Sequence, residues 1–290
     1  MKKSLFRSWR KLSGMEMASN VFLFPGQGSQ YVGMTQKLSG PSAAESQVFR
    51  TAKCTLDYDL LALCVSGPKS RLDQTVFCQP AVMAASLAAA ETVTRGAPVS
   101  ESCVATAGFS VGEITALMFA EALSIEAGLR LIHARATAMQ EACEQREGTM
   151  LTVLGLQEVV LQQMCNDART TTGGEVCIAN YIFPKGYVIS GDARTVEAVG
   201  MRARESGATS KEVSVSGAFH SPLMQPAVEK IRSVLDTLHI NFPPDPSLFK
   251  CHGETLHKCG RNPGVPCPAG DQTGFVGVND PQHGLRLLQS

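Results

Sequence analysis

The sequence lacks net charge, long apolar runs and internal repeats, and each absence narrows what the protein can be. Its 26 basic and 26 acidic residues cancel, so there is no electrostatic argument for a nucleic-acid or lipid-surface partner. No uninterrupted apolar run reaches membrane-spanning length. We therefore expect neither a nucleic acid nor a membrane as a partner.

The ten cysteines lack the spacing of a disulfide or zinc framework. They are scattered over a large chain, which indicates reduced thiols inside a cell or an organelle. Six potential zinc ligands lie near the C-terminus without a CxxC pair or finger-like spacing: Cys251, His252, His257, Cys259, Cys267 and His283. We expect no metal site.

What the sequence does contain is the pattern of an α/β protein. With 290 residues, of which 44% are hydrophobic, it suits one sizeable domain or one domain with a small insert. Short apolar runs predict strands at 21–24 and 103–107. Apolar residues at helical spacing predict helices at 80–92, 114–123 and 125–143.

Between residues 150 and 215 the predicted elements become short and follow a β-α-β-β-α-β order. Strands are predicted at 150–156, 175–182, 187–190 and 211–215, and helices at 158–168 and 195–205. This is the order of a ferredoxin-like unit. We expect it to be a compact insert in a larger α/β body that resumes near Ser216.

The N-terminal segment, residues 1–19, is basic. It carries five lysines and arginines and no acid before Glu16, and several apolar residues could share one helical face. These are features of a mitochondrial presequence. An untargeted basic terminus fits the same residues equally well.

The strongest chemical signal is GFSVGE, from Gly108 to Glu113, between a predicted strand and a predicted helix. A serine between two glycines at such a turn projects its hydroxyl above the sheet, because small neighbours let the backbone turn sharply. The N–H of Val111 then points to where an oxyanion would form, aided by the positive end of the helix. Ser110 is therefore the candidate nucleophile.

A serine hydroxyl needs a base to act as a nucleophile, and the sequence has six histidines. His133 is predicted in the middle of a helix and His239 near a helix end, where structural roles are more common. His220 follows a predicted strand and precedes Pro222, where a helix is predicted to start. Catalytic groups collect at such loop edges, so His220 is the candidate base.

Arg135 permits two interpretations. It lies near the apolar stripe of its predicted helix. Its stem could cover the core while its head reaches water, or its guanidinium could bind a substrate carboxylate with two hydrogen bonds. Spacing alone favours the first.

Five motifs occur in order and together resemble one family. They are FPGQGSQ from Phe24, QPAVMAASLAA from Gln79, GFSVGE from Gly108, ARATAMQEA from Ala134 and SGAFHSPLMQPA from Ser216. The set resembles malonyl-CoA:acyl carrier protein transacylases of the mitochondrial type, and the acyltransferase domains of fatty-acid and polyketide synthases. It covers about residues 20–242. It implies an α/β-hydrolase-like body, residues 20–149 and 216–242, with a ferredoxin-like subdomain at 150–215.

The resemblance implies a role for each residue that matches a family motif. The nucleophile falls on Ser110 and its base on His220. The oxyanion donors fall on the backbone N–H groups of Gln27 and Val111, and the ligand of the malonyl carboxylate falls on Arg135. The implied reaction moves a malonyl group from malonyl-CoA to the serine and then to the phosphopantetheine thiol of an acyl carrier protein. It supplies fatty acid synthesis in the mitochondrial matrix and needs no cofactor.

Two further positions are implied to line the acyl pocket, Met139 and Phe219. The GAFH sequence resembles the ending associated with malonyl selection, where a bulky Phe219 would crowd a branched acyl group. One position departs from the family pattern. The residue before the nucleophile is usually histidine and here is Phe109, as in mitochondrial-type members.

The tail, residues 243–290, does not resemble the family. It is rich in proline and glycine and has no sustained period, so we expect it to be disordered. Permitted codons from Leu248 onward, read one base out of phase, can encode a family-like peptide, which favours a frame shift near 245–248. We expect the altered tail to leave a strand edge exposed and to impair stability and transfer.

Two alternatives to a malonyl transferase remain at this point. A serine hydrolase or thioesterase would share the strand–serine–helix turn, although FPGQGSQ and Arg135 argue against it. A non-catalytic isoform would be explained by the tail.

Overall fold

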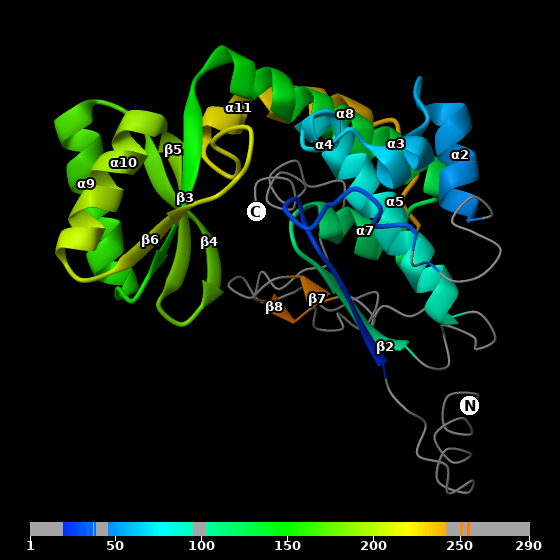
Figure 1. The fold of residues 1–290 in the computed structure, drawn as a ribbon, viewed down its shortest axis with the longest axis horizontal. Helices are drawn as coiled ribbons and strands as arrows, with labels where there is room; N and C mark the ends of the chain where they lie inside the picture. Colours follow the sequence, from blue (N-terminus) through cyan, green and yellow to red (C-terminus); the bar gives the residue numbers. More distant parts are fainter. Residues whose placement is uncertain are drawn as a thin grey trace, which may run out of the picture.

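The computed structural model describes residues 20–36, 38, 46–94, 103–241, 250–251 and 254–255. Within this part the chain is a mixed α/β protein with a larger, mainly helical body and a smaller unit built on one sheet (Figure 1). The expected targeting segment at 1–19 and most of the tail lie outside the described residues.

The body begins with a parallel pair of strands, β1 (Asn20–Phe24) and β2 (Cys103–Gly108). Both match the predicted strands to within one residue. Their register pairs Phe24 with Gly108, so the two strands end side by side. Because each strand is followed by a candidate site motif, this pairing brings the loop after β1 next to the turn after β2.

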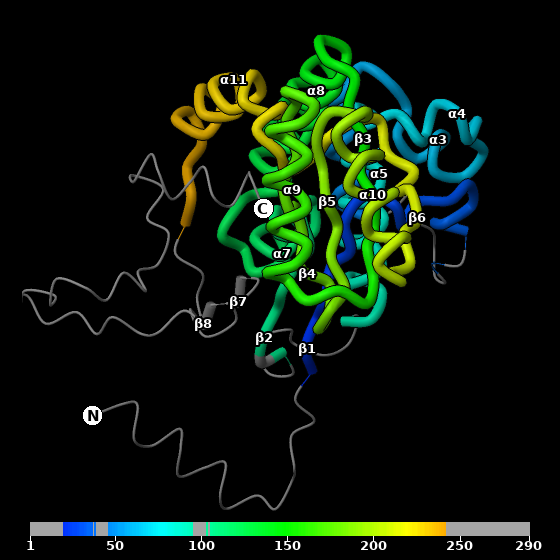
Figure 2. Tube along the Cα trace, turned by 90° about the vertical axis from the view of Figure 1, so that its left-hand side faces the viewer, coloured from blue at the N-terminus to red at the C-terminus, as the bar shows by residue number. Residues whose placement is uncertain are grey.

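The helices of the body form the main core, and α7 (Val111–Phe119) packs against both strands of the pair (Figure 2). The helices are α2 (Gln47–Thr55), α3 (Leu60–Ser66), α4 (Lys69–Leu72), α5 (Thr75–Thr94), α7, α8 (Ile125–Gln145) and α11 (Gln225–Leu235), with a 3-10 turn, η2 (Pro222–Met224), before the last. The helix predicted from Pro80 begins five residues earlier, with the proline inside it.

The helix α5 is the most apolar element of the body. It is long and apolar enough to cross a membrane by length and composition alone, but 61% of that window is buried inside the protein. Its neighbours include α7 and α8. Packing against them accounts for its hydropathy, as in the core helix of a globular domain.

The smaller unit is a four-stranded antiparallel sheet with two helices against it. Its elements are β3 (Gly148–Leu154), α9 (Glu158–Thr172), β4 (Val176–Phe183), β5 (Gly186–Asp192), α10 (Ala193–Glu205) and β6 (Thr209–Glu212). The strand order is β4-β5-β3-β6, and every pairing is antiparallel. Side chains of the sheet, α9 and α10 form a second core.

The strand predicted at 211–215 is displaced in the structure. The strand β6 covers 209–212, and only the N–H of Val213 still bonds to the adjacent β3, at 3.0 Å from Met150 O. Beyond that point the chain leaves the sheet to return to the body. The apolar Val213 and Val215 pack on the body core instead, so their hydropathy was wrongly interpreted as a continuing strand.

In the tail the structure describes two short strands, β7 (Lys250–Cys251) and β8 (Glu254–Thr255), which pair with each other. The remaining tail residues lie outside the described part of the chain.

Candidate active site

Ser110 lies at the turn between β2 and α7, with φ of 53° and ψ of −110°. Two glycines make this turn possible. A Cβ on Gly108 would overlap the backbone of Gly112, and a Cβ on Gly112 would overlap the carbonyl oxygen of Phe24. The turn is therefore packed directly against the end of β1, and the positive φ projects the serine side chain away from the sheet.

The structure brings His220 to this serine, although the two are 110 residues apart in sequence. The distance from Ser110 Oγ to His220 Nε2 is 3.1 Å. His220 lies between β6 and η2, in the loop that returns from the smaller unit, and has φ of 58°. The two residues have the mutual geometry of a nucleophile and its general base.

Arg135, from the middle of α8, is the third side chain at the serine. Its Nη2 donates to Ser110 Oγ at 3.1 Å, and its Nη1 donates to Gln79 Oε1 at 2.7 Å. Only 1% of the residue is exposed, so the interpretation that its head reaches water is wrong. Burial lowers the pKa of Arg135 to about 10, an effect opposed by the charge of the buried Glu113.

A guanidinium has only donors, so Ser110 Oγ accepts the hydrogen bond from Arg135. This leaves the serine O–H able to donate to His220 Nε2 in the tautomer in which that ring nitrogen is unprotonated. The arrangement is that of a serine prepared to lose its proton to the imidazole.

The two backbone N–H groups expected to hold an oxyanion flank the serine. Val111 is the first residue of α7, where an N–H has no partner within the helix. Gln27 lies in the loop after β1, and no hydrogen bond among the described residues uses its backbone N–H. That loop is against the serine turn, since a Cβ on Gly26 would lie 2.7 Å from Phe109 O.

Two buried side chains of the site were given no role by sequence reasoning. Gln79, on α5, bonds Arg135 through Oε1 and lies 3.4 Å from Met139 Sδ through Nε2. Glu113, on α7, is a buried acid near Arg135. The sequence signal that could have identified them is a polar residue on an otherwise apolar helix face. Such a residue is usually buried together with a hydrogen-bond partner.

The two residues expected in an acyl pocket are both buried. Met139 lies one turn after Arg135 on α8, and Phe219 directly precedes His220. Phe109, the position that departs from the family pattern, is 41% exposed and donates its N–H to Phe24 O at 3.0 Å. A phenyl ring has no basic group, so Phe109 cannot replace His220 at the serine.

Within the described residues, no group of three histidine, cysteine or acidic side chains could hold a metal ion. Seven cysteines between residues 54 and 177 are free thiols.

The chain is similar to a known protein family over most of its length. The family model described as an acyl transferase domain matches residues 21–250. A probable mitochondrial malonyl-CoA-acyl carrier protein transacylase from Drosophila melanogaster is 43% identical over 235 residues, which is 78% of this chain and 61% of that protein. The chain thus spans about three fifths of that relative. The Bacillus subtilis malonyl CoA-acyl carrier protein transacylase is 38% identical over 225 residues, 77% of this chain and 70% of that protein.

Solved structures agree with this similarity. The malonyl CoA-acyl carrier protein transacylase from Coxiella burnetii superimposes with a TM-score of 0.72 at 37% identity, covering 80% of this chain and 72% of that one. A malonyl-transacylase in complex with a type II PKS acyl-carrier protein gives 0.71 at 33% identity, covering 78% and 72%.

Proposed function

This chain belongs to the acyl transferase family, and we propose that it transfers a malonyl group from CoA to the phosphopantetheine thiol of an acyl carrier protein through a malonyl-serine intermediate. The observation that carries the proposal is the position of Ser110 Oγ, which lies 3.1 Å from His220 Nε2 and 3.1 Å from Arg135 Nη2. The proposed base, His220, and the proposed ligand of the malonyl carboxylate, Arg135, therefore both contact Ser110 Oγ.

In the first half-reaction Ser110 Oγ attacks the thioester carbonyl and its proton passes to His220 Nε2. The N–H groups of Gln27 and Val111 stabilise the negative oxygen. The C–S bond then breaks, and the imidazolium returns the proton to the CoA sulfur. In the second half-reaction the carrier-protein thiol gives its proton to His220 and attacks the malonyl-serine ester. The C–O bond of the ester then breaks, and the imidazolium returns the proton to Ser110 Oγ.

Arg135 provides the preference for malonyl in this proposal. Its guanidinium is buried and keeps a pKa of about 10, so it is cationic at neutral pH and can receive the malonyl carboxylate in place of its contact with Ser110. An acetyl group would leave the buried charge without that partner, which is penalised. Met139 and Phe219 would line the rest of the acyl pocket.

The chemistry uses only protein groups and two substrates, so we propose no cofactor and no metal, and neither nucleic acid nor membrane as a partner. An acyl carrier protein is favoured because a similar transacylase was solved with one. The mitochondrial matrix, with a role in fatty acid synthesis, is favoured by the basic residues 1–19 and by the mitochondrial relatives from Drosophila melanogaster and Mus musculus.

We also propose the finer assignment of the two parts of the fold. The strand order β4-β5-β3-β6, with α9 and α10 as crossovers, has the connectivity of a ferredoxin-like subdomain at 150–215. The parallel pair β1-β2 with its serine turn before α7 supports an α/β-hydrolase-like body at 20–149 and 216–242.

Intact-mass measurement after brief exposure to malonyl-CoA tests the function. We expect a single malonyl adduct on the chain, its loss in Ser110→Ala, and its retention in Ser206→Ala, a control at an exposed serine. Addition of a carrier protein should move the adduct to its thiol. Release of free malonate instead would identify a hydrolase, and the absence of any adduct would contradict both activities.

A further inference from the structure

The base of the site has a backbone conformation that needs support. His220 has φ of 58°, in the left-handed region that residues with a side chain seldom adopt. Such a conformation persists only where surrounding contacts over-determine it. Contacts of the neighbouring residues must therefore hold the loop at His220.

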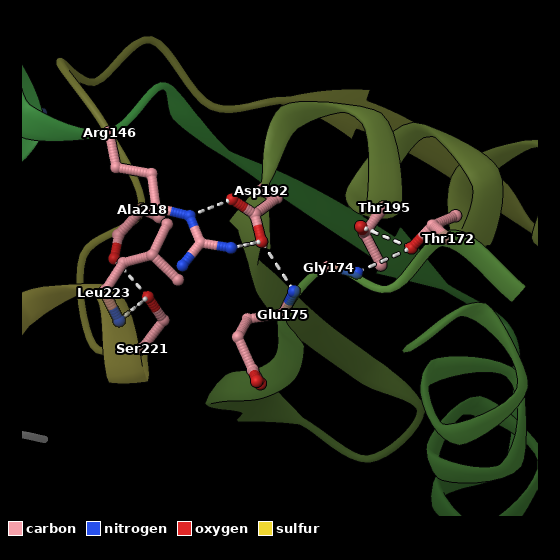
Figure 3. Close-up of polar contacts among 9 residues, drawn as sticks. All are labelled: Arg146, Thr172, Gly174, Glu175, Asp192, Thr195, Ala218, Ser221 and Leu223. Carbon is pink, nitrogen blue, oxygen red and sulfur yellow. Dashed lines mark hydrogen bonds and ion pairs between the residues drawn. The ribbon is translucent and has the colours of Figure 1, made fainter. Parts of the chain in front are cut away.

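The side chain of Ser221, the next residue, bridges the loop across His220. Its Oγ donates to Ala218 O at 2.6 Å and accepts from Leu223 N at 3.3 Å (Figure 3). One atom thus connects the chain before the histidine to the chain after it. Ser221 is 9% exposed, so water competes little for these hydrogen bonds. We call this contact the Ser221 bridge.

The loop is also packed against both parts of the molecule where it begins. A Cβ on Gly148, at the start of β3, would lie 2.6 Å from Ala218 Cβ, and a Cβ on Gly217 would overlap Cys143 of α8. At the histidine itself, Cys177 Sγ lies 3.8 Å from His220 O. The beginning of the loop is therefore held by packing, and the Ser221 bridge spans its centre.

An ion pair holds the smaller unit at the same junction. Arg146, which follows α8, donates to both carboxylate oxygens of Asp192 at 2.6 Å each. Asp192 Oδ2 also accepts from Glu175 N at 2.5 Å (Figure 3). The Arg146 side chain is half exposed, so this pair adds only a modest restraint at the junction that β3 and the loop to His220 share.

We propose that Ser221 is a positioning residue, whose hydroxyl fixes the backbone of His220 so that Nε2 faces Ser110. The proposal deepens the proposed function and rests on it only for the identity of the acyl group. A displacement of about 1 Å in a catalytic group can cost about 100-fold in rate. Loss of the bridge should therefore slow every reaction of Ser110 that needs the imidazole.

The test measures how fast Ser110 is labelled by a fluorophosphonate. The serine oxygen bonds to phosphorus, fluoride leaves, and His220 accepts the serine proton, so the rate reports the Ser110–His220 pair without malonyl-CoA. Ser221→Thr and Ser221→Val form the matched pair, because they have nearly the same shape and only threonine keeps the hydroxyl. Ser124→Ala is the control, since Ser124 caps α8 through a similar bond to Ala127 N at 3.1 Å.

We expect Ser221→Val to be labelled about tenfold or more slowly than Ser221→Thr, and Ser124→Ala to be labelled at the original rate. In malonyl transfer, Ser221→Val should have a lower kcat, whereas its KM for malonyl-CoA should change by less than about twofold. The reason is that Arg135, the proposed ligand of the malonyl carboxylate, is unaltered in this variant. Equal labelling of the folded threonine and valine variants would overturn the proposal. Failure of the valine variant to fold, when the threonine variant folds, would also overturn the proposal, because the hydroxyl would then be needed for the stability of the whole body. A labelling difference without any malonyl adduct would keep this proposal and reject malonyl transfer.

Discussion

At the scale of single residues, the site depends on the buried positive charge of Arg135, and burial of an ionised group costs free energy. Arg135 is almost fully buried, and its two terminal nitrogens donate hydrogen bonds to Ser110 and Gln79. The negative charge of Glu113 offsets part of the desolvation cost of the guanidinium. Its Nε remains buried without a partner. The buried cation is therefore incompletely satisfied in the free protein, which favours a carboxylate ligand.

Arg135→Ala should remove the preference for malonyl. A hydrogen bond to a charged group contributes about 1.5–3 kcal/mol, which corresponds to roughly 10- to 150-fold in the ratio of malonyl-CoA to acetyl-CoA acylation. The measurement is acyl-enzyme formation with each substrate. Arg130→Ala is the control, because Arg130 is an exposed arginine of the same helix that contacts Thr237 at 3.4 Å. An unchanged ratio in Arg135→Ala would show that the carboxylate binds elsewhere.

At the scale of elements, the site is held by short connections between well-packed helices and strands. The serine turn joins β2 to α7, and α5 and α8 carry Gln79 and Arg135 from the core side. Two thiols are buried among these helices, Cys64 on α3 and Cys78 on α5. Burial raises the pKa of each to about 12 from an ordinary value of 9.0.

These thiols predict an alkaline limit to stability. In the unfolded chain they lose their protons near pH 9, but in the folded chain only near pH 12, so the folded state binds more protons in between. Their stabilisation is complete below pH 9 and is lost as the pH rises towards 12, by at most about 1.4 kcal/mol per thiol and pH unit. Urea unfolding between pH 8 and 11 should show a shallower decline for Cys78→Ala than for the original chain. The exposed Cys54→Ala should leave the decline unaltered, and an identical decline in all three would refute this account.

At the scale of the whole molecule, β1 exposes two apolar side chains to solvent. Val21 is 56% exposed and Leu23 75% exposed on β1, which pairs only with β2 in the described part of the chain. Parallel strands are usually covered on both faces. An apolar face beside an unpaired strand edge is a site of association. The expectation that the tail impairs stability and transfer stays a prediction, and turnover of the purified chain tests it.

Leu23→Lys should reduce self-association without lowering the melting temperature by more than a few degrees, because an exposed leucine contributes little to the core. Light scattering during incubation near the melting temperature measures the effect. Val159→Lys on α9 is the control, since Val159 is 81% exposed but not on a strand. If both variants suppressed scattering equally, added charge alone would explain the result and the β1 face would have no special role.

The sequence by itself indicated the strands β1 and β2, the order of the elements between 150 and 215, the serine turn at Ser110 and His220 as the candidate base among six histidines. These depend on apolar periodicity, glycine stereochemistry and motifs, which act over a few neighbouring residues. It did not determine where β6 ends, because Val213 and Val215 are equally apolar in a strand or against the body.

Only the tertiary structure decided the direction of Arg135, the part played by Gln79 and Glu113, and the bridge made by Ser221. Helical spacing places a side chain on a face but does not say whether that face meets water or another helix. The partners that decide this are distant in sequence, 56 residues apart for Gln79 and Arg135 and 110 for Ser110 and His220. Burial and orientation therefore arise only when the folded chain brings such segments together.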